Sequence, residues 1–145
     1  MTVKIVKLQQ NAKIPTYGST EAAGADLYAC IDAPVTILPG QTVLIPTGLS
    51  MEIEQGFAGF IYARSGLATK RGLAPANKVG VVDCDYRGQV MVSLHNHTDQ
   101  PQQVEPDERI AQMVFAPVYQ AVFCEVDALN DTERGTGGFG STGTK

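Results

Sequence analysis

Long apolar runs are absent from this sequence of 145 residues. A helix needs about 20 consecutive apolar residues to cross a bilayer, so the sequence predicts no membrane span. The first residues, Met1–Lys7, also lack the apolar stretch of a secretion signal. We therefore expect a cytoplasmic protein with no membrane partner, long enough for one domain with a hydrophobic core.

Positive charge is scarce. Eleven lysine and arginine residues stand against fifteen aspartate and glutamate residues, which gives a formal net charge of −4 and a pI of about 5.0. Because DNA and RNA are bound through basic surfaces, we expect no nucleic-acid partner. The balance still allows a small anionic ligand, since a few converging arginines outweigh a mildly acidic average.

Cysteine and histidine are too few and too scattered for a metal centre. Cys30, Cys84 and Cys124 contain no Cys-x-x-Cys pair, which argues against a disulfide framework and a structural zinc site. We expect three reduced thiols, mostly in the core. His95 and His97 resemble half of a metal site but lack a third ligand, so we expect surface or interface histidines with no catalytic role.

Glycine (15) and proline (8) are plentiful and separate many short apolar runs. Alternation with a period of two, interrupted by turn residues about every ten positions, predicts antiparallel strands in a sandwich or barrel. The predicted strands are Val3–Ile5, Ala25–Ala29, Thr42–Ile45, Met51–Glu54, Phe60–Tyr62, Val90–Leu94 and Val118–Val126. The turn Pro46–Gly48 is expected to end the third of them.

One stretch predicts a short helix. Residues 65–72 begin with Ser65, a good N-cap residue, and end at Gly72. Arg64 precedes the cap, so a guanidinium, a hydroxyl and free backbone N–H groups meet at one point, as phosphate recognition requires. A capped turn with a surface arginine is the alternative.

The segment Gly80–Gly88 carries two acidic residues at the end of an apolar strand. Asp83 and Asp85 share one face if the strand is regular, and a strand end suits a positioned general base. A plain hairpin turn explains the same residues equally well. Three more polar residues on predicted strands, each of which can be an ordinary exposed side chain, are Asp26, Arg109 and Gln112.

The C-terminal residues 130–145 are rich in glycine and contain one apolar side chain, Phe139. Such composition is typical of a disordered tail. The alternative is a mobile flap over a nucleotide, because Arg134, Phe139, Ser141 and Thr142 supply a charge, a stacking ring and two hydroxyls.

Five segments, in order, resemble the five motifs of the trimeric dUTPases. They are Gly24–Ala29, Ala63–Ala68, Asn77–Gly88, Glu108–Met113 and Arg134–Gly143. The resemblance implies an all-β jelly roll over residues 1–129 with one short helix, and an arm, residues 130–145, that closes over the active site. It also implies a homotrimer whose active sites are shared between subunits. The implied reaction is Mg²⁺-assisted hydrolysis of dUTP to dUMP and pyrophosphate, which limits uracil in DNA and supplies dUMP for dTMP synthesis.

The same resemblance assigns roles to single residues. Asp83 matches the carboxylate that activates the attacking water, Asn77 the group that holds the uracil edge, and Tyr86 the ring under the deoxyribose. Asp26 matches the acidic residue that contacts the metal through water. Matches to phosphate-binding positions are Arg64, Ser65, Gly66 and Gln112. Matches in the arm are Arg134, Ser141 and Thr142 at the γ-phosphate and Phe139 stacked over uracil, with Gly140 as a further substrate-binding position.

Cys84 departs from the pattern, because smaller residues such as alanine or serine are commoner beside the base. A thiol there predicts sensitivity to oxidation. Two other functions fit the same fold: a dCTP deaminase, which binds a similar nucleotide, and a non-catalytic regulator that binds a protein partner. The intact Asp83–Tyr86 pattern favours the hydrolase over both.

Overall fold

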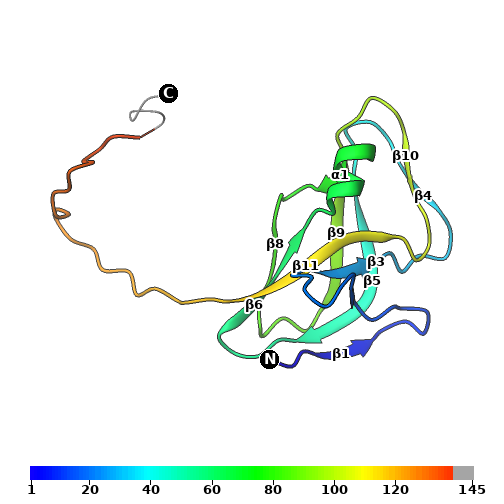
Figure 1. Cartoon of the computed structure of the whole chain (residues 1–145), viewed down its shortest axis with the longest axis horizontal. Helices are drawn as coiled ribbons and strands as arrows, with labels where there is room; N and C mark the ends of the chain where they lie inside the picture. The colour runs from blue at the N-terminus through cyan, green and yellow to red at the C-terminus, as the bar shows by residue number, and fades with distance from the viewer. Residues whose placement is uncertain (139–145) are drawn as a thin grey trace.

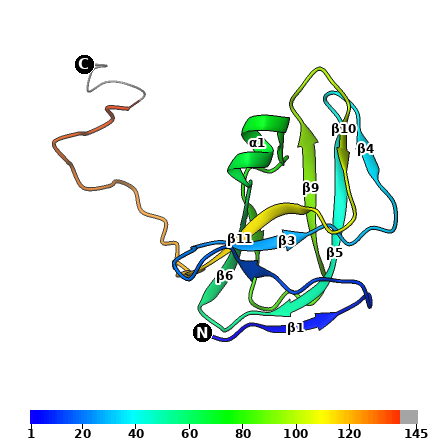
Figure 2. The same ribbon diagram turned by 45° about the vertical axis from the view of Figure 1, so that its right-hand side comes forward.

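The structure, a computed structural model, describes residues 1–138, and its strands form a β-sandwich with a short helix at one edge (Figures 1 and 2). Every strand pair is antiparallel, as the alternating pattern predicted. The one helix of the described chain, α1 (Ser65–Arg71), has seven residues, too few to cross a membrane.

Two sheets make up the sandwich, and a strand pair extends it. The first sheet has the order β1 (Lys4–Lys7), β5 (Thr42–Glu52), β9 (Gln89–Asn96), β7 (Leu73–Pro75). The second has the order β2 (Thr16–Tyr17), β3 (Ala25–Tyr28), β11 (Arg109–Pro117), β6 (Phe57–Tyr62), β8 (Gly80–Val82). The pair is β10 (Gln102–Val104) with β4 (Val35–Ile37).

The core lies between the two sheets and follows the predicted alternation. Along β9 every second side chain is buried, and Val90, Val92 and Leu94 belong to one hydrophobic cluster with Leu27 of β3 and Met113 of β11. Burial of such branched side chains is the main driving force for the fold.

Strand β5 differs from the prediction. Thr42–Ile45 and Met51 belong to one strand of eleven residues, and Pro46–Gly48 is a β-bulge inside it. The pairing with β9 shifts between Pro46 and Leu49, and Gly48 has φ +68°. A bulge explains the error, because it accepts a proline and a glycine without ending the strand.

The predicted strand Val118–Val126 is also wrong. Residues 118–138 follow β11 without helix or strand and run away from the sandwich, with a turn at residues 133–136 (Figure 1). Val122 and Phe123 are each 95% exposed. Alternation alone did not produce a strand because the segment pairs with no other strand of residues 1–138.

The cysteines are less buried than expected. Only Cys30 is buried, while Cys84 is half-buried and Cys124 is exposed. Burial, with the charges of Asp32 and Asp107, raises the pKa of the Cys30 thiol, which therefore stays protonated and unreactive.

Candidate active site

Three segments that are distant in the sequence meet across β11. Gln112 of β11 pairs with Asp26 of β3 on one side and with Tyr62 of β6 on the other. The chain leaving β6 then reaches Arg64 and the start of α1. This register gathers residues of the first, second and fourth motifs around one pocket of about 250 Å³. The lining residues are Gly18, Ala22, Gly24, Asp26, Arg64, Ser65, Gly66, Arg109 and Gln112.

Asp26 joins two arginines in this pocket. Nε of Arg64 donates to Oδ1 at 2.7 Å, and Nη1 of Arg109 donates to Oδ2 at 3.3 Å. Asp26 is 8% exposed, and its two partners stabilise the buried charge. The three side chains together carry one net positive charge, so the pocket suits an anion.

The start of α1 adds donors to this pocket, although its cap differs from the prediction. Arg64, not Ser65, occupies the N-cap position, with no side-chain cap bond, and Ser65 is the first helical residue. The backbone N–H groups of Ser65 and Gly66 lie in the first turn of the helix. There, no carbonyl oxygen of the helix can accept a hydrogen bond from them. The end at Gly72 is confirmed by its left-handed φ of 60°.

Gln112 is held against the chain that enters α1. Its Nε2 donates to the carbonyl oxygen of Ala63 at 2.9 Å. A Cβ atom on Gly24 would lie 2.5 Å from Oε1 of Gln112, so only glycine allows this approach.

A second pocket, of about 330 Å³, lies beside the third motif. Asn77, Asp83 and Tyr86 line it together with apolar side chains of β5, β6, β8 and β9. Strand β8 ends at Val82, and Asp83 is the first residue of a turn. In this turn the backbone N–H of Tyr86 donates to the carbonyl oxygen of Asp83 at 3.2 Å. The predicted shared strand face of Asp83 and Asp85 is therefore wrong, because both residues belong to the turn.

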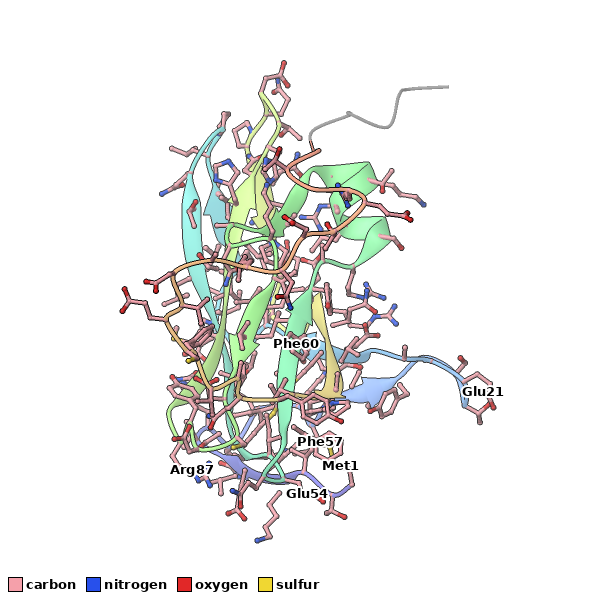
Figure 3. The ribbon with its side chains drawn as sticks, turned by 90° about the vertical axis from the view of Figure 1, so that its left-hand side faces the viewer. Met1, Glu21, Glu54, Phe57, Phe60 and Arg87 are labelled. Atoms are coloured by element: carbon pink, nitrogen blue, oxygen red, sulfur yellow. The ribbon has the colours of Figure 1, made fainter. Side chains whose placement is uncertain are left out.

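Arg87 braces that turn from outside the pocket. Its Nη1 donates to the carbonyl oxygens of Cys84 at 2.8 Å and Tyr86 at 3.2 Å. It lies at the same end of the molecule as Glu54 (Figure 3). The wide hollow between them carries the carboxylates of Glu52, Glu54 and Asp85, which would repel a triphosphate.

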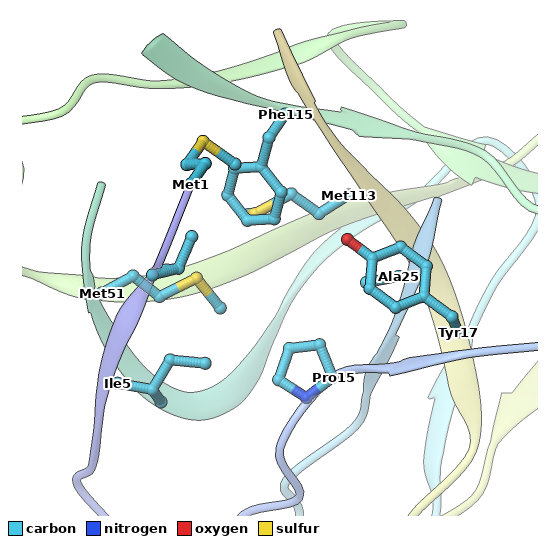
Figure 4. A pocket seen from close by; sticks show the side chains of 9 residues that line it. Met1, Ile5, Pro15, Tyr17, Ala25, Met51, Met113 and Phe115 are labelled. Carbon is cyan, nitrogen blue, oxygen red and sulfur yellow. The ribbon is translucent and has the colours of Figure 1, made fainter. Parts of the chain in front are cut away.

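The apolar pocket between β1, β2 and β11 is not a candidate either. Apolar side chains such as Met1, Ile5 and Phe115 dominate its lining, and the phenol of Tyr17 carries its one polar side-chain group (Figure 4). Its lining carries no charged side chain to bind phosphate.

The predicted site residues are thus divided between two pockets that share no lining residue. Arg134 lies in neither pocket, and its Nε donates to the carbonyl oxygen of Gly137 at 2.8 Å. Phe139, Gly140, Ser141 and Thr142 lie outside the described residues. Groups of three or more metal-ligating side chains are absent from residues 1–138. The Nδ1 atom of His95 shares a hydrogen bond with the hydroxyl of Thr42.

Arg109 is the site residue that the sequence did not assign. Regular strand geometry puts residues three apart on opposite faces, which separates Arg109 from Gln112. The pairing of β11 with β3 is irregular between Arg109 and Ala111, and this bulge brings both side chains into one pocket. The sequence signal that could have assigned Arg109 to the site was its place in the same motif as Gln112.

Comparison with known proteins decides the family, because a family model described as dUTPase matches residues 10–143. The chain belongs to the dUTPase family. It is 49% identical to a deoxyuridine 5'-triphosphate nucleotidohydrolase of Thiobacillus denitrificans and 52% identical to one of Nautilia profundicola, with 99% of each chain covered. The dUTPase of Staphylococcus bacteriophage 80alpha, solved with dUPNHPP, matches with a TM-score of 0.89 and 25% identity over 98% of both chains. The predicted all-β jelly roll of the dUTPases is thereby confirmed.

The buried position of Asp26 in this dUTPase gives a stability prediction. Asp26→Asn keeps the side-chain shape but removes the charge that holds both guanidinium groups. We expect the free energy of unfolding, measured by urea denaturation, to fall by about 1–2 kcal/mol. Glu52→Gln breaks the exposed pair with Lys4 and serves as the control, with no measurable change expected. Equal stability of the Asp26→Asn variant and the parent would show that Asp26 does not anchor the arginines.

Proposed function

We propose that this chain hydrolyses dUTP to dUMP and pyrophosphate. The observation that carries the proposal is the pair of pockets that the family motifs build: a cationic one around Asp26, Arg64 and Arg109, and one that joins the Asp83 carboxylate to an apolar cleft. A nucleoside triphosphate needs both environments, one for its phosphates and one for its base and sugar.

The cationic pocket binds the triphosphate in this proposal. Arg64 and Gln112, with the N–H groups of Ser65 and Gly66, supply donors for phosphate oxygens, and Arg109 adds charge. In phosphoryl chemistry a protein acts mainly by positioning the reacting groups and neutralising charge, which fits this set of residues.

The second pocket holds the nucleoside and the attacking water. Asp83 takes a proton from the water that attacks the α-phosphorus, Asn77 bonds to the uracil edge, and the Tyr86 ring excludes a 2′-hydroxyl. A failed hydrogen bond to cytosine would leave polar groups unpaired, so the same pocket rejects dCTP.

We propose that the complete site is assembled between copies of the chain, since the residues of the five motifs line two separate pockets that share no residue. We propose the homotrimer of the dUTPases, with the arm 130–145 of a neighbouring copy closing the site. The exposed apolar side chains of the tail support assembly: Tyr119 is 96%, Phe123 95% and Leu129 86% exposed. Apolar side chains exposed to this degree along an extended segment gain free energy when they are buried against another copy.

Magnesium fits this site as an ion carried by the substrate. Asp26 is the single carboxylate of the cationic pocket, and each of its oxygens already accepts a hydrogen bond from an arginine. One such carboxylate suits a water-mediated contact, because Mg²⁺ keeps several waters and prefers phosphate oxygens. When bound, the ion neutralises charge on the phosphates, while Arg64 and Arg109 orient them.

Measurement of pyrophosphate release from dUTP, dCTP, dTTP and UTP tests the function. We expect release from dUTP far above the other three, with no ammonia formed from dCTP. Ammonia from dCTP would identify a deaminase, and no reaction with any of the four would favour a non-catalytic regulator.

Chelation tests the metal. We expect excess EDTA to lower kcat/KM for dUTP by about 10- to 100-fold, and added Mg²⁺ to restore it, since the triphosphate charge is then only partly neutralised. Unchanged activity after exhaustive dialysis against EDTA would exclude magnesium from the reaction.

A further inference from the structure

The ring of Tyr86 is folded back over its own chain. Its hydroxyl donates to the carbonyl oxygen of Gln89 at 3.1 Å, and the ring covers Gly88 between them. The side chain is 46% exposed, so packing against the core does not fix this orientation. Its contacts with Gln89 and Gly88 hold it there instead.

Gly88 leaves the space that the ring occupies. A Cβ atom built there would lie 2.5 Å from Cζ and 2.8 Å from Cε2 of Tyr86, with the hydroxyl oxygen closer still. The three nearest atoms all belong to this ring. The φ of Gly88 is not positive, so a left-handed backbone does not require glycine there, and the nearest obstacle to a Cβ atom is the ring.

The backbone on both sides of Gly88 is held by β5, at its bulge and just beyond it. Ser50 Oγ donates to the carbonyl of Arg87 at 2.7 Å, and Thr47 Oγ1 donates to the carbonyl of Val90 at 2.6 Å. Ser50 and Thr47 are themselves buried. A methyl group at position 88 would therefore displace the exposed ring rather than the anchored chain.

We propose that Gly88 is the positioning residue that makes Tyr86 discriminate deoxyribose from ribose. The inference rests on the proposed function, in which the Tyr86 ring excludes a 2′-hydroxyl. Gly88 does not contact the nucleotide in this account. It acts by allowing the one ring orientation that closes the space beneath the sugar.

A double-mutant cycle tests the proposal with Gly88→Ala, Tyr86→Ala and the two combined. The readouts are the ratio of kcat/KM for dUTP over UTP and the ratio of the binding constants for dUMP over UMP. We expect Gly88→Ala to lower both ratios by about 10-fold or more, as a pocket contact of this size allows. In the Tyr86→Ala background, Gly88→Ala should cause no further loss.

The outcomes separate this inference from the function on which it rests. A parent protein that does not prefer dUTP over UTP refutes the proposed function. A parent that prefers dUTP, beside a Gly88→Ala variant with the same preference, overturns the role of Gly88. So does an equal loss from Gly88→Ala with and without the Tyr86 ring, which would point to the backbone.

Thermal unfolding keeps the test decisive if Gly88→Ala folds poorly. Relief of the defect in the combined variant would locate the conflict on the Tyr86 ring and support the proposal. A combined variant as unstable as Gly88→Ala alone would overturn it.

Discussion

Replacing Asp83 by asparagine is expected to lower kcat for dUTP by about 10²- to 10⁴-fold, the usual contribution of a positioned general base. The amide has the shape of the carboxylate but cannot accept a proton from water. Binding should change little, because Asp83 lies in an exposed turn and the phosphate donors lie in the other pocket. Single-turnover pyrophosphate release and equilibrium binding of a non-hydrolysable dUTP analogue measure the two effects separately.

Asp85→Asn is the matched control for this experiment. Asp85 belongs to the same turn and undergoes the same change of charge, but it lines the acidic hollow and not the Asp83 pocket. We expect its kcat to stay within a few-fold of the parent value. A normal kcat in the Asp83→Asn variant, or an equal loss in the two variants, would remove Asp83 as the base.

The sandwich could be predicted because its signal is local. The alternate burial of side chains on a strand follows from the sequence of that strand alone, as Val90, Val92 and Leu94 show. The pattern therefore predicted the all-β class. The end of α1 at Gly72 was predictable for the same reason, since a left-handed residue favours glycine.

The errors share a physical cause, which is that bulges and missing partners are not local. The bulge at Pro46–Gly48 depends on β9, and the one that turns Arg109 toward Asp26 depends on β3. Val118–Val126 has the alternation of a strand but no partner in residues 1–138. The division of the site between two pockets could not be predicted from local residue patterns either. Only the family resemblance predicted a shared site.

Removal of residues 134–145 is expected to leave a folded protein with kcat/KM for dUTP lowered by about 10³-fold. Of the removed residues, 134–136 are exposed in the single chain, so their loss costs the core almost nothing. Activity should fall because Arg134 and the arm exclude water and complete the charge around the phosphates, and missing donors of this kind cost about 10²- to 10³-fold each.

Arg134→Ala in the full-length chain separates the two contributions of the arm. We expect it to lose part of the activity through charge alone, while the truncated chain loses more because the site also stays open to water. Circular dichroism, thermal unfolding and light scattering check that fold and oligomeric state survive truncation. Loss of the fold or of the oligomer would make the arm a structural element. Because the exposed apolar tail residues 118–129 remain in the truncated chain, it should still assemble, so a lower rate reports on the arm and not on dissociation.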